Sequence, residues 1–197
     1  MTPDDLKDQV DRVGPFLAGK KVFFLGDDDH ISPLLAQDFE VKPVVYEFDE
    51  RIRTNLSTWF GRLGVENSVV SPYDARQPIV IDNPCEAFYI NPPYSSRSEG
   101  LGVKVWLMRA LEACQPTCSG ILVMPRNGGN VESKWVGTVE KSVDEFIKQN
   151  GFVTTNIEAN VSSYDGTTER RLMSSNVYLE RTDPSKSLAI DPANLYN

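Results

Sequence analysis

The sequence is poor in the residues from which disulfide-bonded and zinc-bound proteins are built. Its 197 residues include three cysteines and one histidine. The cysteines (Cys85, Cys114 and Cys118) are odd in number and form no Cys-x-x-Cys pair, which argues against a disulfide framework and a structural zinc site. We therefore expect structural cysteines and no transition metal, and we leave open a hard cation on clustered carboxylates.

Long apolar runs are also missing. No run approaches the ~18 residues needed to span a bilayer. The first residues, MTPDDLKDQVDRV, are acidic and lack the basic and then apolar order of a signal peptide. We therefore expect a cytoplasmic protein with no membrane partner.

Positive charge is the third shortage. The chain has 20 Lys and Arg against 28 Asp and Glu, a net charge of −8. Because phosphate backbones attract basic faces, this balance makes a nucleic-acid partner less expected and a small cationic ligand more expected. The oligomeric state stays open, a homo-oligomer included.

The chain instead carries a regular alternation of strand-like and helix-like segments. Short apolar runs predict strands at 20–26, 42–49, 67–74, 85–94 and 119–125. Apolar residues at helical spacing predict helices at 3–13, 31–39, 50–64, 101–114 and 143–151. We expect Ser32 to cap the second helix. Two final strands, at 152–165 and 171–182, are joined by a turn-like DGTTE at 165–169.

This order predicts an α/β fold, with a doubly wound, mostly parallel seven-stranded sheet and a C-terminal antiparallel hairpin. We expect a single domain over residues 1–197, with a helical extension at 1–19 and an irregular tail at 182–197. In such sheets, ligands bind outside the carboxyl ends of the strands. Four successive predicted strands bring an acidic or amide residue to that edge, in GDDDH, YEFDE, SPYDAR and NPPY.

The first of these strand ends lacks the GxGxxG turn that binds phosphates. It has one glycine, Gly26, followed by Asp27, Asp28 and Asp29. Three carboxylates would repel a pyrophosphate, so NAD, FAD and ATP are disfavoured. A cationic nucleoside fits better. S-adenosylmethionine carries a sulfonium and an ammonium group, and its decarboxylated form keeps both and loses the carboxylate.

The second strand end, VVYEFDER, has an acid where nucleoside-binding sheets bind ribose. Glu47 lies about 20 residues after the first turn, as that pattern requires, and a carboxylate can accept from two adjacent hydroxyls. Strand alternation places Glu47 and Asp49 on one side and Phe48 on the other. We assign Glu47 and Phe48 to the nucleoside. Asp49 stays open, because it also fits the N-cap of the next helix.

The third and fourth strand ends add an acid and an amide. Asp74 either accepts from an adenine amino group or forms a turn, and Ala75 beside it is assigned to the same nucleoside. Asn91 offers a donor and an acceptor, and its carbonyl with that of Pro92 can hold an amine whose lone pair points at an electrophilic carbon. Tyr94 supplies an aromatic face for a base or a cation.

Together these segments resemble known families. The second-strand acid and NPPY are similar to the Rossmann-like S-adenosylmethionine-dependent methyltransferases, whose amino-methylating members use an Asp/Asn-Pro-Pro-aromatic motif. The ordered set FFLGDDDHIS, EFDERI, YDARQP and NPPYSSRSEGLGVKVWLMRALEA resembles more closely the catalytic domain of the branched-chain polyamine synthases, the bis(aminopropyl)spermidine synthase family. With LMSSNVYLER, the resemblance extends over most of residues 20–181.

The resemblance implies a Rossmann-like methyltransferase fold, with S-adenosylmethionine or its decarboxylated form as the donor substrate. It also implies that the GDDD carboxylates meet a polyamine. Asp28 or Asp29 would orient the amine and take its proton, a role that a raised pKa favours. We expect the backbone turn to use Asp27, which with Gly26 is assigned to the donor side. His30 is interpreted as a polar surface residue rather than a base.

Two differences from the family keep the transferred group open. The family usually carries an N-terminal winged-helix-like domain, which we do not expect within these 197 residues. Its double proline commonly follows Asp and precedes an acid, whereas Asn91 and Tyr94 stand here. Aminopropyl transfer to a polyamine is our leading interpretation, ahead of methyl transfer.

Two other interpretations remain. A methyltransferase acting on an amino group of a nucleobase, a nucleotide or a protein would be favoured by a basic groove formed by Arg97, Lys104, Arg126 and Lys134. A non-catalytic partner subunit would be indicated by exposed apolar surface around Trp106 or Trp135.

Overall fold

Seven strands form a single mixed sheet in the computed structural model, which describes residues 3–94, 99–126, 134–164 and 172–195. The strands are β1 (Lys21–Leu25), β2 (Lys42–Glu47), β3 (Val69–Pro72), β4 (Cys85–Ile90), β5 (Cys114–Pro125), β6 (Phe152–Tyr164) and β7 (Leu172–Arg181). Their order is β3-β2-β1-β4-β5-β7-β6. β1 to β5 pair in parallel, and β7 runs antiparallel between β5 and β6. The predicted fold class is therefore confirmed. The turn predicted at 165–169 lies outside the described residues.

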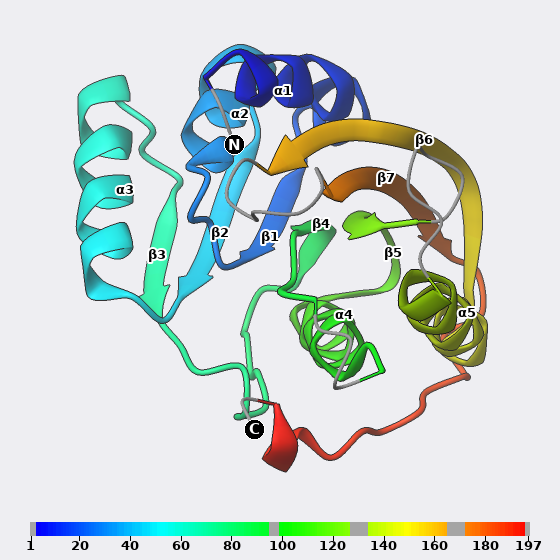
Figure 1. Cartoon of the computed structure of the whole chain (residues 1–197). Helices are drawn as coiled ribbons and strands as arrows, with labels where there is room; N and C mark the ends of the chain where they lie inside the picture. The colour runs from blue at the N-terminus through cyan, green and yellow to red at the C-terminus, as the bar shows by residue number, and fades with distance from the viewer. Residues whose placement is uncertain (1–2, 95–98, 127–133, 165–171, 196–197) are drawn as a thin grey trace.

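Helices cover both faces of the sheet (Figure 1). They are α1 (Pro3–Leu17), α2 (Ile31–Phe39), α3 (Glu50–Leu63), α4 (Leu101–Ala113) and α5 (Lys134–Gln149). Figure 1 shows α1, α2 and α3 on one side of the sheet and α4 and α5 on the other. α1 continues past the predicted end at residue 13, and α5 begins at Lys134 rather than at residue 143.

Strand alternation divides the core into two layers. In β1, Val22 and Phe24 pack with the helices α1 to α3, whereas Phe23 and Leu25 pack with α4 and α5. All four side chains are at most 3% exposed. A central parallel strand covered on both faces reads as a continuous apolar run, which is why KVFFL marks the middle of the sheet.

The two terminal segments are attached to opposite sides of this core. The buried Gln9 amide of α1 donates to the Tyr89 hydroxyl (3.0 Å) and to the Asn176 side-chain oxygen (2.7 Å). At the other end, Ile190 and Leu195 pack against the core on the α4–α5 side, around the short 3₁₀ helix η1 (Pro192–Asn194). None of the helices described combines the length and the apolar character needed to cross a membrane.

Candidate active site

A cavity of about 450 Å³ opens at the carboxyl edge of β1, β2 and β4, a volume suited to a nucleoside-sized ligand. It is lined by Leu25, Gly26, Asp28, Tyr46, Glu47, Phe48, Ile52, Tyr73, Ala75, Asn91, Pro92, Pro93, Tyr94 and Trp106. The structure thus brings together most of the predicted site residues. Asp27, Asp29 and Asp74 do not line this cavity.

The turn after β1 requires glycine at its first position. Gly26 has a φ of +68°, and its N–H donates to the Tyr46 carbonyl (2.8 Å). A Cβ at Gly26 would stand 2.7 Å from the Trp106 ring. Both the backbone conformation and the close approach of the indole therefore exclude a larger residue.

Asp27 holds the turn together. Its carboxylate accepts from the backbone N–H groups of Ile31 (2.9 Å) and Ser32 (3.2 Å) and from the Ser32 hydroxyl. Burial raises the pKa of Asp27 to about 6, against the opposing effect of these hydrogen bonds. The prediction that the turn uses Asp27 is confirmed. The prediction that Ser32 caps α2 was wrong, because the buried Asp27 accepts from the first helical N–H groups and Ser32 lies inside the helix.

Asp28 and Asp29 face different surroundings. Asp28 lines the cavity, whereas Asp29 accepts a hydrogen bond from the Asn91 amide (3.2 Å). Partial burial, followed by the negative charges of Asp29 and Glu47, raises the pKa of Asp28. Asp28 is therefore the acid of this turn whose position and basicity suit it to accept a proton from a ligand in the cavity.

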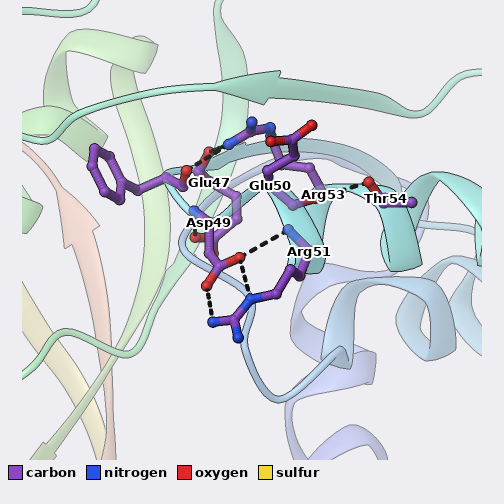
Figure 2. Close-up of polar contacts among 7 residues, drawn as sticks. Glu47, Asp49, Glu50, Arg51, Arg53 and Thr54 are labelled. Carbon is purple, nitrogen blue, oxygen red and sulfur yellow. Dashed lines mark hydrogen bonds and ion pairs between the residues drawn. The ribbon is translucent and has the colours of Figure 1, made fainter.

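Glu47 is the buried acid of the site. One carboxylate oxygen accepts from the Asp27 N–H (3.0 Å) and the other from the Asp49 N–H (2.7 Å). Each oxygen has a second lone pair, so the side chain can still accept from two ligand hydroxyls. The Arg53 guanidinium donates to the Glu47 and Phe48 carbonyls (3.0 and 2.6 Å) and fixes the strand end, as Figure 2 shows.

Phe48 and Asp49 depart from strict strand alternation, because β2 ends at Glu47. Phe48 lines the same cavity as Glu47 and is 70% exposed, so it lies where its assignment to the nucleoside requires it. Asp49 accepts from the Arg51 N–H (2.8 Å) and pairs with the Arg51 guanidinium (Figure 2). These contacts hold the pKa of Asp49 well below its usual range. Asp49 is thus the N-cap of α3.

The third strand end contributes Ala75 rather than Asp74. The Asp74 carboxylate accepts from the Arg76 N–H (2.9 Å) and pairs with its guanidinium. The Asp74 carbonyl accepts from the Gln77 N–H (2.9 Å). This is the turn-forming arrangement of the two that the sequence left open, and the adenine contact of Asp74 stays a prediction. Ala75 is buried and lines the cavity.

An ion pair on α4, between buried Arg109 and partly exposed Glu112, holds Ala75 in place. Arg109, only 3% exposed, donates from Nε to the Ala75 carbonyl (2.9 Å) and pairs with Glu112. Glu112 in turn accepts from the Ile79 N–H (2.8 Å). The loop that follows β3 is therefore attached to α4 at two points, and the cavity wall depends on both.

The NPPY segment forms the wall at the end of β4, as predicted. The Tyr94 hydroxyl donates to the Asn91 side-chain oxygen (3.3 Å), while the Asn91 nitrogen donates to Asp29. These contacts orient the Asn91 amide. At Gly102, in the first turn of α4, a Cβ would stand 2.8 Å from the Pro93 carbonyl oxygen. The absence of a side chain at Gly102 therefore lets the first turn of α4 pack directly against the NPPY segment.

Several apolar and aromatic residues that line the cavity were not predicted from the sequence. They are Leu25, Tyr46, Ile52, Tyr73, Pro93 and Trp106. Tyr46 and Tyr73 directly precede predicted site residues, and their rings lie 5.2 Å apart, so their position at strand ends was an available signal. Trp106 is half-buried, and its indole N–H has no acceptor within the described part of the chain.

Three other predictions concern the surroundings. Trp106 and Trp135 are partly buried against the core, so the exposed apolar surface that would indicate a partner subunit is not found there. Of the predicted basic groove, Arg126 pairs with Glu140 and Asp144 at 2.8 and 2.9 Å, and Arg97 lies outside the described residues. A metal site is a separate question. Within the described ranges, no three or more His, Cys, Asp or Glu side chains lie close enough together to hold a metal ion.

The strand order and the carboxyl-edge cavity define a Rossmann-like domain of the methyltransferase type. An S-adenosylmethionine-dependent methyltransferase from Aquifex aeolicus has the same fold, with a TM-score of 0.62 and 15% identity over 92% of this chain and 94% of that one. More specifically, the chain belongs to the family of the branched-chain polyamine synthase A C-terminal domain, whose model matches residues 10–186. The resemblance stated from the sequence is confirmed.

Individual relatives agree with this assignment. The N(4)-bis(aminopropyl)spermidine synthase of Thermococcus kodakarensis is 26% identical over 152 residues, 75% of this chain and 41% of that protein. An uncharacterized protein of Methanocaldococcus jannaschii is 27% identical over 76% of this chain and 36% of its own length. This chain therefore spans about two fifths of the length of these relatives.

A solved relative shares the fold over almost the whole chain. The branched-chain polyamine synthase from Thermus thermophilus, in complex with N4-aminopropylspermidine and 5′-methylthioadenosine, superimposes with a TM-score of 0.76. Its sequence is 22% identical, and the match covers 95% of this chain and 58% of that one.

Proposed function

We propose that this chain transfers an aminopropyl group from decarboxylated S-adenosylmethionine to an amino group of a polyamine and releases 5′-methylthioadenosine. One observation carries the proposal: the carboxylates of Asp28 and Glu47 line the same cavity. Asp28 lies in the turn after β1, and in phosphate-binding sheets this turn is rich in glycine and binds an anion. Membership of the family and the polyamine product held by the Thermus thermophilus relative support it.

Donor binding follows from the cavity walls. Glu47 would accept from the two ribose hydroxyls with the lone pairs that its backbone contacts leave over. Phe48 and Ala75 would flank the adenine. The carboxylate of S-adenosylmethionine would be repelled by Asp28 and Glu47, whereas the decarboxylated donor lacks that group. The site therefore favours the decarboxylated form.

In the transfer step, the amine nitrogen attacks the methylene carbon bonded to the sulfonium. A C–N bond forms, the C–S bond breaks, and its electron pair neutralises the sulfur. The amine proton passes to Asp28, whose raised pKa suits a general base. Asn91 and the Pro92 carbonyl would orient the amine, and Tyr94 would present its ring to the cationic centre.

The test pairs each donor with each acceptor. Purified protein is incubated with spermidine and either decarboxylated S-adenosylmethionine or S-adenosylmethionine, and products are identified by mass spectrometry. We expect 5′-methylthioadenosine and an aminopropylated triamine with the first donor only. Methylated product with the second donor would establish methyl transfer instead, and absence of both products would refute transferase activity.

Asp28→Asn separates chemistry from binding. We expect kcat to fall by about 10²- to 10⁴-fold, the usual contribution of a general base, while the Kd for 5′-methylthioadenosine changes little. Asp38→Asn, an exposed acid on α2, is the matched control. Equal loss of transfer and nucleoside affinity in Asp28→Asn would make Asp28 a nucleoside ligand or a structural residue.

A further inference from the structure

A second hollow lies on the other side of the GDDD turn. It has a volume of about 360 Å³ and is lined by Asp29, His30, Asn55, Thr58, Trp59 and Arg62. We call it the α3 groove, because four of these residues lie on α3. Asp28 lines the main cavity and Asp29 lines the α3 groove. Asn91 of the main cavity donates to Asp29 of the α3 groove (3.2 Å), so this side-chain pair lies between the two spaces.

An aromatic pair forms one wall of the α3 groove. The Trp59 ring is 38% exposed, and its centroid lies 5.7 Å from that of His30 in an edge-on arrangement. His30 has a φ of 57°, which is rare for a residue with a side chain. Its Nδ1 lies 3.0 Å from the Asp28 carbonyl oxygen. Because that oxygen can only accept, Nδ1 carries the proton. The turn therefore places His30 where it supports Trp59.

The remaining walls offer hydrogen-bond acceptors. The Thr58 hydroxyl donates to the Thr54 carbonyl (2.8 Å), so its oxygen lone pairs remain available. Asn55 is exposed and has a side-chain carbonyl. An ammonium group donates three hydrogen bonds and is attracted by carboxylates and indole faces. Asp29, Trp59 and these oxygens together match such a group.

We infer that the α3 groove binds the ammonium-bearing arm of the acceptor that points away from the reaction. The inference rests on the proposed function and extends it to acceptor length. An acceptor whose reacting nitrogen lies beside Asp28 would pass along Asp29 and reach Trp59 with its far ammonium. A diamine too short to pass Asp29 would gain nothing from the groove. Trp59 is thereby a specificity-determining residue for longer polyamines.

Arg62 sets the limit of the groove. Its guanidinium is always charged and lies among the same lining residues, so it repels an ammonium that extends past Trp59. The α3 groove thus combines the attractive carboxylate of Asp29 with the repulsive guanidinium of Arg62. Arg62→Gln is expected to lower the KM for the longest acceptors.

The test measures KM for 1,3-diaminopropane, spermidine and spermine with decarboxylated S-adenosylmethionine. We expect Trp59→Leu to raise the ratio of the spermidine KM to the diaminopropane KM by about 2- to 5-fold, the strength of a cation–π contact at an exposed site. Trp59→Phe should restore part of this ratio. Leu63→Ala is the matched control, because Leu63 lies on the same helix with 40% exposure and does not line the α3 groove.

The outcomes are separable. If the wild-type protein transfers to no amine, the proposed function fails before the groove is tested. If it transfers to spermidine and Trp59→Leu leaves the KM ratio within twofold of wild type, the groove inference is wrong while the function stands. A ratio that Leu63→Ala changes as much as Trp59→Leu would also overturn it, since the effect would then belong to α3 as a whole.

Discussion

The pH dependence of stability should reveal the buried carboxyl of Asp27. Its pKa rises from 3.8 to about 6 in the folded protein, chiefly because it is buried. The folded state therefore binds a proton more tightly than the unfolded state, and stability is lost as the pH rises through this window. At about 1.36 kcal/mol for each pH unit, the loss amounts to about 3 kcal/mol between pH 3.8 and pH 6.

Asp27→Asn isolates this contribution. The amide resembles the protonated acid in shape: its oxygen can accept from the Ile31 N–H, and its NH2 group, like the acid O–H, can donate to the Ser32 hydroxyl oxygen. Urea denaturation of both proteins from pH 4 to pH 8 gives their free energies of unfolding. We expect similar values near pH 4 and a difference that grows to about 3 kcal/mol in favour of Asn by pH 7.

The opposite slope would refute this reasoning. If Asp27→Asn loses stability relative to wild type as the pH rises, the carboxylate charge stabilises the α2 N-terminus by more than its burial costs. The Asp27 pKa would then be depressed rather than raised. Asp38→Asn, which changes an exposed carboxyl on the same helix, should leave the wild-type profile unchanged.

Two further predictions concern the cavity walls. Glu47→Gln should weaken 5′-methylthioadenosine binding by about 10- to 100-fold, the value of hydrogen bonds to a charged acceptor; calorimetry that shows unchanged affinity would remove Glu47 from the nucleoside site. Arg109→Met should cost about 2 kcal/mol of stability, since it leaves the carbonyl of buried Ala75 without its donor, and should also weaken nucleoside binding through Ala75. Arg51→Met, which breaks an exposed pair, should leave the urea midpoint unchanged, and an equal effect of both variants would contradict the role of Arg109.

The sheet could be predicted because its signals are local. KVFFL and the other apolar runs fix the strands, and the alternation with helices fixes the parallel order. The residues at which helices and strands begin and end were harder to predict. The first turn of α2 is capped by a side chain four residues upstream, and Ser32 alone fits the usual N-cap pattern equally well. β2 also ends at Glu47, two residues before the predicted end at residue 49, so strict alternation does not extend to Phe48 and Asp49.

The contacts that shape the site depend on distant residues. Asp49 was correctly considered as a cap because its partner is two residues away. Arg109, by contrast, reaches Ala75 from a helix 34 residues further along the chain. Trp106 approaches Gly26 across the sheet edge. No spacing rule predicts such pairs, because tertiary packing alone decides which helix faces which loop.

Three adjacent carboxylates become tolerable because the turn gives each a different environment. Asp27 accepts the N–H groups at the positive end of α2, and Asp29 accepts from the Asn91 amide. Asp28 stands between them and has its pKa raised by burial and by both neighbouring charges on Asp29 and Glu47. A cationic ligand that enters either hollow lowers this repulsion. The charge cluster is therefore more stable with such a ligand than without it, and the cavity and the α3 groove are linked through Asp28 and Asp29.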